Sequence, residues 1–365
     1  MTSSRWIAVI ASSAVLAVGV AACGDNNDTT GGGGGGASLS GDLAGAGSSA
    51  QEAAQEAFKA NFESENPDVT ISYDPIGSGG GQDQFIAGGK TTFAGSDAPF
   101  DTDQLPQASK RCAPGELIQI PDYVSPIAVI YNLSGVDSLQ LSPETAAQIF
   151  NQKITSWNDP AIKKDNPGVD LPSTRITPVN RSDDSGTTFN FTDYLSQAAK
   201  SDWPYEASET WPVKGGEAAA QTSGVVQAVN AGDGAIGYAD LSQAGDLGVA
   251  KIKVGSKYVD PTPAGAAKDL ELSKPDPALS KGKYVSAYSI DRTSTDPSTY
   301  PVLLVSYLIG CTDYGNKDTN ALVKGYFGYI NSSAGQQAGA GNAGSAPLTD
   351  ALIKKNQPAI DAIKG

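Results

Sequence analysis

The sequence predicts an α/β fold with mainly parallel sheets, arranged in two domains. Stretches with the alternating pattern of strands are followed by stretches with the spacing of amphipathic helices, which is the order typical of α/β proteins. The chain has 365 residues, enough for two domains and a sizeable core. Glycine- and hydroxyl-rich turns join several strands to the helices that follow, and ligands of such sheets bind at these places.

The first half of the chain follows this alternation. The patterns predict a helix over 50–62, a strand over 69–73, a short helix over 82–87 and a strand within 92–99. The segment 116–132 is rich in Ile, Val and Tyr. We expect it to hold two strands near a crossing between the domains.

The second half continues the alternation. Ser142 and Pro143 have the residue types of an N-cap and a first helical residue, and they predict a helix that runs to Phe150. The other expected elements are strands over 175–180, 234–238 and 301–309, and helices over 189–195, 217–230, 319–330 and 348–363. Gly224 and Pro358 are expected to interrupt the helices that contain them. The last of these strands is expected to be a second crossing.

The turn that starts at Arg181 has the residue types of an anion site. It follows a strand and opens a helix, so Ser185, Gly186 and Thr187 can direct free N–H groups at one point. Arg181 supplies a planar fork suited to two oxygens of a phosphate or carboxylate, and Asp183 is near enough in sequence to orient it. The alternative is an ordinary N-cap beside a surface ion pair.

Two similar turns add further donors, and a third strand end adds one acceptor. The donors are the Ser49 hydroxyl, the Ala50 N–H and Ser78 with the N–H groups after it, and the acceptor is the Asp97 carboxylate. Phosphate at neutral pH keeps a proton that Asp97 can accept, whereas sulfate has none and is repelled. This combination of many donors with one acceptor favours phosphate over sulfate as the ligand. Taken singly, each turn also fits a structural connection, and Asp97 fits a helix cap or a surface carboxylate.

The first residues predict export and lipid attachment. Residues 1–22 contain Arg5 and then an uncharged apolar run that is short for a membrane span, which is typical of a cleaved signal. Val20 to Ala22 lead into Cys23 as in a bacterial lipobox, where the cysteine sulfur carries lipid. Residues 23–38 include six consecutive glycines and predict a flexible tether. The alternative is a plain signal followed by an incidental cysteine.

The composition narrows the chemistry. Cys112 and Cys311 remain after the anchor, and outside the cytoplasm such a pair predicts a disulfide. The chain has no histidine, which excludes His-dependent nucleophilic catalysis and His-ligated zinc. We expect no cofactor and no metal. The formal charge of −15 argues against nucleic acid as a partner.

Over nearly the whole mature chain, the sequence resembles the extracytoplasmic phosphate-binding proteins (PstS type) of high-affinity phosphate ABC transporters. The motifs that carry the resemblance are Gly77-Ser78-Gly79-Gly80, Gly95-Ser96-Asp97-Ala98-Pro99, Arg181-Ser182-Asp183-Asp184-Ser185-Gly186-Thr187-Thr188-Phe189 and Gly234-Ala235-Ile236-Gly237-Tyr238. The chain departs from the family at Ser49 and Ala50, where Thr and then Phe are usual. Serine keeps the hydroxyl and alanine keeps the amide.

The resemblance implies a two-lobed periplasmic-binding-protein fold of type II, with two mixed, mainly parallel sheets and phosphate in the cleft between the lobes. It implies a lobe I of 39–124 and 305–365, which contains Cys112 and Cys311, and a lobe II of 125–304. The implied phosphate-binding residues are Ser49, Ala50, Ser78, Asp97, Arg181, Ser185, Gly186 and Thr187, with Asp183 in support. The implied role is that of a monomeric, lipid-anchored receptor on the cell membrane, without enzymatic activity, that delivers phosphate to a membrane permease.

Other functions remain open on the sequence. A receptor for another oxyanion would share the donors, and Asp97 is the feature against it. A secreted phosphohydrolase would use Ser185 or Thr187 as its nucleophile, but no residue that would activate either hydroxyl is evident. A surface adhesin or structural lipoprotein would leave the cleft without a ligand.

Overall fold

The structure is a computed structural model that describes residues 38–365. The predicted signal at 1–22, the lipid attachment at Cys23 and the tether up to Ala37 lie outside the described residues. Within the described part, strands alternate with helices, which confirms the α/β class. None of the helices between residues 38 and 365 is long and apolar enough to cross a membrane.

The N-terminal elements build a parallel sheet whose turns share one edge. They are β1 (Gly41–Gly47), α1 (Glu52–Glu65), β2 (Val69–Asp74), α2 (Ser78–Ala87), β3 (Phe93–Ser96) and α3 (Gln104–Arg111). β1 lies between β2 and β3 and is parallel to both. The turns that follow these three strands therefore lie side by side, and they carry Ser49, Ser78 and Asp97.

A long strand, β4 (Leu117–Asn132), links this sheet to the next. The sequence analysis expected two strands here, and that expectation is wrong. β4 pairs antiparallel with β15 (Leu303–Cys311) as far as Pro126, and from Ile127 onward it pairs antiparallel with β8 (Ala235–Asp240). The strand changes partner without ending.

The two prolines of β4 do not end the strand. Pro121 lies beside a bulge, because the register with β15 passes from Tyr123 to Pro121 and skips Asp122. Pro126 lies where β4 leaves β15. Both are places where a strand tolerates a missing N–H, so neither proline ends β4.

The middle of the chain forms the second sheet and its helices. Its elements are β5 (Gln140–Leu141), α4 (Pro143–Phe150), α5 (Pro160–Asp165), β6 (Thr177–Arg181), α6 (Gly186–Ala198), β7 (Glu217–Ala219), α7 (Gln221–Ala231), β8, the 3-10 helix η1 (Leu241–Gln243), β9 (Gly248–Val249), β10 (Lys251–Val254) and β11 (Lys257–Val259). In the second sheet, β6 lies between β7 and β8 and is parallel to both. β5, β10 and β11 form a separate three-stranded sheet. The carboxyl end of β6 carries Arg181, and α6 begins just after it.

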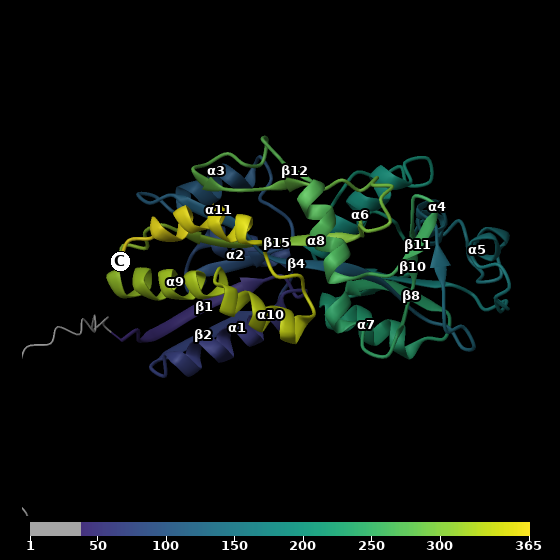
Figure 1. Cartoon of the computed structure of the whole chain (residues 1–365), viewed down its shortest axis with the longest axis horizontal. Helices are drawn as coiled ribbons and strands as arrows, with labels where there is room; N and C mark the ends of the chain where they lie inside the picture. Colours follow the sequence, from purple (N-terminus) through teal and green to yellow (C-terminus); the bar gives the residue numbers. More distant parts are fainter. Residues whose placement is uncertain (1–37) are drawn as a thin grey trace, which may run out of the picture. The chain divides into compact units, whose positions relative to one another are not determined.

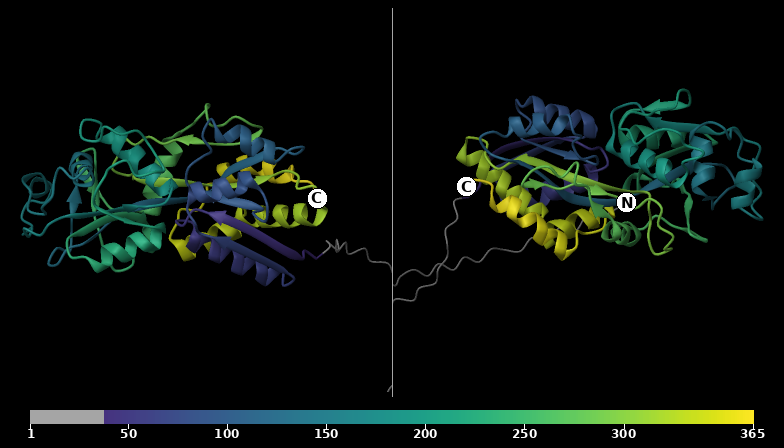
Figure 2. Two further views of the ribbon diagram at one scale, coloured as in Figure 1. Left: turned by 180° about the vertical axis from the view of Figure 1, so that it is seen from behind. Right: turned by 90° about the horizontal axis from the view of Figure 1, so that it is seen from above.

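The C-terminal part returns to the first sheet. Its elements are α8 (Pro263–Leu272), β12 (Lys274–Pro275), β13 (Tyr284–Val285), β14 (Tyr288–Ser289), β15, α9 (Lys317–Ile330), α10 (Ser333–Ala343) and α11 (Asp350–Asp361). α10 packs along α1, and α9 packs beside β1. Both views of Figure 2 accordingly keep the C-terminal helices with the N-terminal elements.

The described residues form a two-lobed α/β fold. The strand order β2-β1-β3-β15-β4-β8-β6-β7 joins the two sheets through β4. Figure 1 shows β4 and β15 running between a group of elements that includes β1, α1 and α9 and a group that includes α4, α5 and β8. Val124 and Val305, which stand at the two boundaries of the implied lobe I, are register partners in these strands.

The exact lobe ranges are a proposal. We propose that lobe I comprises 39–124 and 305–365 and that lobe II is the chain between them. One strand pairing moves a short segment of this intervening chain to lobe I. β13 pairs with Ile118 and Gln119 of β4, next to the first sheet. The short segment around β13 therefore groups with lobe I, although it precedes the second crossing in sequence.

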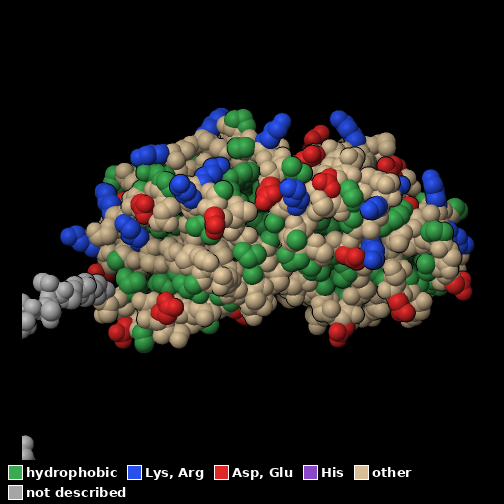
Figure 3. Space-filling model, viewed as in Figure 1, with side chains coloured by type: hydrophobic (Ala, Val, Ile, Leu, Met, Phe, Trp, Pro, Cys, Tyr) green, Lys and Arg blue, Asp and Glu red, His purple; other side chains and the backbone are tan. Residues whose placement is uncertain are grey.

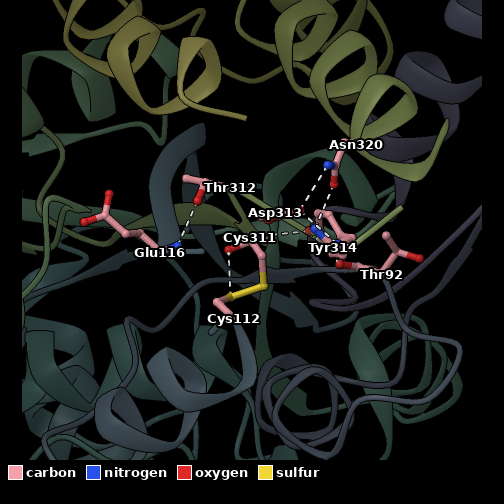
Figure 4. Close-up of a disulfide and its surroundings, with 10 residues drawn as sticks. Thr92, Cys112, Glu116, Cys311, Thr312, Asp313, Tyr314 and Asn320 are labelled. Atoms are coloured by element: carbon pink, nitrogen blue, oxygen red, sulfur yellow. Dashed lines mark hydrogen bonds between the residues drawn. A yellow bond between two sulfur atoms is a disulfide. The ribbon is translucent and has the colours of Figure 1, made fainter. Parts of the chain in front are cut away.

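The predicted disulfide is present within this fold. Cys112, at the end of α3, is bonded to Cys311, at the end of β15, with 5.2 Å between their Cα atoms (Figure 4). The Thr312 hydroxyl beside it accepts a hydrogen bond from the N–H of Glu116 at 2.8 Å. The bond ties a helix to a strand of the first sheet, which confirms the expected pairing.

Two expected helix interruptions are wrong. Gly224 lies inside a continuous α7, and the first residues of the expected helix form β7 instead. Pro358 lies inside α11, which continues to Asp361 while Ala359 and Ile360 are buried. Each helix packs one face into the protein, and this burial outweighs the cost of a single glycine or proline in the helix.

Candidate functional site

The predicted binding residues lie near the first turns of helices that follow strands of the first sheet and of the second sheet. α1 and α2 start at turns of the first sheet, and α6 starts at the end of β6 in the second. Every predicted residue is buried: Ser49, Ala50, Ser78, Asp97, Arg181, Ser185, Gly186 and Thr187. Since the first N–H groups of a helix have no acceptor within it, these helix starts direct partial positive charge at one place.

Asp97 is held by hydroxyl groups from three different parts of the chain. Ser48 Oγ donates to its Oδ2 at 2.7 Å, and Thr187 Oγ1 donates to the same oxygen at 3.2 Å. Ser306 Oγ of β15 donates to Oδ1 at 2.5 Å. A carboxylate oxygen can accept two hydrogen bonds, so Oδ1 can accept one more, for example from a ligand O–H.

The charge state of Asp97 reflects opposing effects. Burial raises its pKa, while the hydrogen bonds from Ser306 and Ser48 and the positive charge of Arg181 act to lower it. The carboxyl is therefore desolvated and yet well supplied with donors. Such a group is poised to accept a proton that a ligand brings.

A second buried carboxyl lies close to the first. Burial, and next the charge of Asp97, raise the pKa of Asp122 well above its usual range. Gln51 Nε2 donates to Asp122 Oδ1 at 3.4 Å and also to Ser306 Oγ. The negative charge of Asp97 thus adds to burial in favouring the neutral form of Asp122.

Arg181 is oriented as the sequence predicted. Its Nε donates to Asp183 Oδ1 at 2.8 Å, and its Nη2 donates to Asp183 Oδ2. Burial alone would raise the pKa of Asp183, but the hydrogen bond and charge of Arg181, together with main-chain N–H groups that include that of Gln221, outweigh burial and lower that pKa. Asp183 Oδ1 also accepts the N–H of Gln221 at 2.9 Å. Asp183 thus fixes the guanidinium and the start of α7 together.

Ser49 contacts the second sheet in a way that the sequence did not predict. Its Oγ accepts the N–H of Thr222 at 3.0 Å and lies 3.0 Å from Thr222 Oγ1. The Ser49 carbonyl accepts Gln243 Nε2 at 2.8 Å. α7 therefore brings a further helix start to the site, and its first residue, Gln221, has a φ of 62°, which L-residues rarely adopt.

Close backbone contact between the lobes requires glycine at two positions. A Cβ on Gly186 would lie 2.6 Å from Ser78 Oγ and 2.7 Å from the Ala98 nitrogen. Gly77 has a φ of 100°, and a Cβ there would lie 2.5 Å from Asp183 Oδ2. Larger residues would hold the two lobes apart at the site.

The remaining predicted residues also have structural hydrogen bonds. Ser185 caps α6 by accepting the Thr188 N–H at 3.2 Å, as its residue type predicts. Ser78 Oγ accepts the Asp97 N–H at 3.1 Å, and the Ala50 N–H donates to Ser48 Oγ at 3.1 Å. The structure thus brings all the predicted residues into one region.

Several residues that shape this region were missed by the sequence analysis. They are Gln51, Asp122, Asn190, Thr222, Gln243 and Ser306. Ser48, which also bonds to Asp97, had a local signal because it adjoins the predicted Ser49 in the same turn. The others lie in ordinary helix or strand sequence, and their proximity depends on the pairing of distant segments.

The residue types at the site do not favour a metal. No group of three or more His, Cys, Asp or Glu side chains suited to a metal ion occurs among residues 38–365. The arrangement instead offers N–H, hydroxyl and guanidinium donors around one carboxylate. Its chemistry suits a small oxyanion that carries a proton.

Comparison with known proteins identifies the class and then the family. Residues 32–334 match the family model of the PBP superfamily domain. Phosphate-binding protein PstS 3 of Mycobacterium leprae (strain TN) is 34% identical over 336 residues, which cover 88% of this chain and 86% of the relative. Phosphate-binding protein PstS2 of Mycobacterium bovis (strain BCG / Pasteur 1173P2) is 36% identical over 330 residues, which cover 88% and 87%. The chain therefore belongs to the PstS family of phosphate-binding proteins.

Solved structures show the same fold at lower identity. A high-affinity periplasmic phosphate-binding protein (PfluDING) bound with phosphate superposes with a TM-score of 0.72 at 22% identity, covering 89% of this chain and 99% of that one. A putative phosphate ABC transporter substrate-binding protein with bound phosphate from Clostridium perfringens superposes with a TM-score of 0.60 at 17% identity, covering 85% and 100%. These likenesses confirm the two-lobed architecture.

Proposed function

We propose that this protein binds inorganic phosphate with high affinity outside the membrane and delivers it to a phosphate ABC permease. Its membership of the PstS family supports this function. The observation that carries the proposal is the buried Asp97 carboxylate among hydroxyl, N–H and guanidinium donors. A site for an unprotonated oxyanion would have no use for such an acceptor.

Each predicted residue has a distinct part in the proposed binding. Arg181, oriented by Asp183, offers its remaining N–H groups to phosphate oxygens. The N–H groups of Gly186 and Thr187 at the start of α6 complement the negative charge. Asp97 Oδ1 accepts the phosphate proton. Sulfate would leave this carboxylate facing an oxygen with no proton between them, which disfavours it.

The remaining donors come from the first lobe and from the cap of α6. The hydroxyls of Ser49, Ser78, Ser185 and Thr187 and the amides of Ala50 and Ser78 surround the same region. The hydroxyl oxygens of Ser49, Ser78 and Ser185 each accept a main-chain N–H, and we propose that their own O–H groups donate to phosphate oxygens. A hydroxyl can accept and donate at once, so these main-chain partners stay paired when phosphate binds.

No catalytic step is part of the proposal. Thr187 Oγ1 donates to Asp97, and Ser185 Oγ caps α6, so both candidate nucleophiles are engaged in structural hydrogen bonds. The observations favour reversible binding over phosphate-ester hydrolysis. Release of product from a chromogenic phosphate ester by the wild-type protein would contradict this part of the proposal.

We also propose that the protein is held on the outer face of the cell membrane as a monomer by lipid on Cys23. The signal and lipobox pattern of the sequence supports this location. On the face shown in Figure 3, blue Lys and Arg side chains are interspersed with red acidic ones. Replacing Cys23 with alanine should release the protein from membranes into the soluble fraction.

Isothermal titration calorimetry of phosphate-stripped protein tests the binding itself. Residues 38–365 should bind one phosphate per chain with high affinity at neutral pH. The absence of binding heat would contradict the proposed function. Because phosphate contaminates most buffers, stripping by unfolding and refolding in phosphate-free solution is the necessary control.

A further inference from the structure

Asn190, which is not one of the predicted phosphate-binding residues, links the two lobes beside Asp97. Asn190, in the second turn of α6, is 3% exposed. Its Nδ2 donates to the main-chain oxygen of Asp97 at 2.7 Å and to the Gly186 oxygen at 2.9 Å. α6 belongs to the proposed lobe II and Asp97 to lobe I, so the first of these bonds crosses between the lobes.

A buried arginine holds this asparagine in place. Arg292 is 1% exposed, and its Nη2 donates to Asn190 Oδ1 at 2.7 Å. Its Nε donates to Asp193 Oδ2 at 2.9 Å, on the next turn of α6. Its Nη1 donates to the oxygens of Pro301 at 2.9 Å and Leu303 at 2.7 Å. The guanidinium therefore fastens α6 to the chain that enters β15, the second crossing strand.

The chemistry of these contacts fixes the orientation of the Asn190 amide. Arg292 can only donate, so it must face the amide oxygen, and the two carbonyls can only accept, so they must face the amide nitrogen. Asparagine satisfies all of these partners at once. An aspartate at the same position would keep the bond to Arg292 but would place a second oxygen against the Asp97 carbonyl.

We propose that Asn190 and Arg292 are positioning residues that latch α6 onto the Asp97 turn when the lobes close. The inference rests on the proposed function and extends it, because neither residue belongs to the predicted phosphate-binding set. The Asp97 main chain is then gripped on both sides, since its N–H donates to Ser78 Oγ at 3.1 Å. Because the latch joins the two lobes, it stabilises the arrangement in which they are in contact and so slows phosphate release.

The variant Asn190→Asp tests the latch while it keeps the contact to Arg292. We expect the rate constant for phosphate release to rise about tenfold or more, because a hydrogen bond becomes a repulsive contact between two oxygens. The association rate constant should stay within about twofold, since the latch forms after encounter. Stopped-flow fluorescence with phosphate gives both constants. The affinities for phosphate and arsenate should fall by the same factor, because the latch contacts neither anion.

A matched control lies on the same helix. Gln197 is exposed and donates to Asp193 Oδ1 at 2.8 Å, but it does not reach Asp97. Gln197→Ala should leave both rate constants unchanged. Arg292→Lys should give a smaller increase in release than Arg292→Met, because lysine keeps one donor for the Asn190 oxygen. If the methionine variant does not fold, Asn190→Asp and Arg292→Lys still decide the matter.

Small-angle X-ray scattering separates failure of the latch from failure of phosphate binding. With saturating phosphate, Asn190→Asp should show a larger radius of gyration than the wild type. Equal radii together with an unchanged release rate would overturn the latch while leaving phosphate binding intact. If the wild type binds no phosphate, the proposed function fails. The latch is then tested by comparing the radii of gyration of the ligand-free wild type and Asn190→Asp. A larger radius in the variant supports the latch, and equal radii overturn it.

Discussion

At the scale of single residues, the site combines one acceptor with many donors. Asp97 accepts three hydroxyl groups, and Arg181 is held by Asp183 through two of its nitrogens. We propose that the carboxylate discriminates between anions by their protonation, while the guanidinium attracts any anion. These two contributions are separable by mutation because they concern different properties of the ligand.

Replacing Arg181 with lysine should weaken all oxyanions equally. Lysine keeps the positive charge but loses the fork and the paired contacts to Asp183. We expect the affinities for phosphate and arsenate to fall by a common factor of about 100. Competition calorimetry with both anions gives the two factors. Arg175→Lys, at an exposed arginine of the same lobe, serves as the control, and a change in the phosphate-to-arsenate ratio would contradict the assignment.

The sequence predicted local roles better than distant contacts. Ser185 as an N-cap and the pairing of Arg181 with Asp183 depend on residues within a few positions of one another, and both are confirmed. The contact of Ser306 with Asp97 spans 209 positions. No local pattern marks Ser306, because an inward-facing serine on an apolar strand has the same residue type whether or not it meets a carboxylate.

At the scale of elements, the site depends on helices that begin at the ends of parallel strands. This arrangement follows from the strand–turn–helix order and was predictable. The continuity of β4 was not, because Pro121 and Pro126 have the appearance of strand ends in the sequence. Only the pairing partners on both sides show that these prolines occupy a bulge and a change of partner.

Replacing Gly186 with alanine should prevent closure without harming α6. The new Cβ would lie 2.6 Å from Ser78 Oγ, across the boundary between the lobes. Alanine favours helix by roughly 1 kcal/mol over glycine, so α6 itself should not be destabilised. Phosphate affinity should fall by at least about 100-fold, which corresponds to a few kcal/mol of steric conflict.

A second glycine offers a matched control for that experiment. Gly224 lies inside α7, where an added Cβ would approach Ala219 Cβ only to 3.5 Å, an ordinary contact. Gly224→Ala should therefore leave phosphate affinity within about twofold of the wild type. Calorimetry on both variants is the measurement. Equal affinities in the two variants would show that close packing at Gly186 is not required for binding.

Removing the disulfide should reduce stability but not binding. Cys112 and Cys311 are 199 positions apart in sequence, and cross-linking so distant a pair stabilises a protein by about 4–5 kcal/mol in the chain-entropy view. The bond lies at the end of β15 that is paired with Leu117, away from the crossing at Val305. Lobe movement therefore does not strain it.

The double variant Cys112→Ala, Cys311→Ala provides the test. Urea unfolding should show a lower free energy of unfolding, and calorimetry should show an unchanged phosphate affinity. A large loss of affinity in a variant that is still folded would mean that the disulfide takes part in closure.

At the scale of the whole molecule, the acidic chain contains several carboxyls whose pKa is raised by burial. Burial raises the pKa of Asp240 to about 6, that of Asp269 to about 7 and that of Glu209 to about 8, and in Glu209 the charge of Asp184 adds to the effect. Each of these groups binds its proton more tightly in the folded state than in the unfolded chain. Protonation of these groups therefore favours the folded state.

Stability of the ligand-free protein should fall as the pH rises from about 5 to about 8. The stabilisation from these carboxyls is complete below their unfolded pKa values and is lost as the pH passes through the folded values of about 6 to 8. Urea unfolding at several pH values measures the trend. Asp269→Asn should flatten part of it, because the amide does not titrate. A free energy of unfolding that rises over this range would contradict the prediction.

The central claim is that Asp97 selects phosphate by accepting its proton. Competition calorimetry at neutral pH, with phosphate and sulfate on the wild type and on Asp97→Asn, tests it most directly, and Asp103→Asn at an exposed position of the same segment is the control. The wild type and the control should bind phosphate and show no measurable affinity for sulfate. In Asp97→Asn the phosphate-over-sulfate preference should fall by at least about tenfold, because the amide can donate to an unprotonated oxygen. An unchanged preference in that variant would contradict the account.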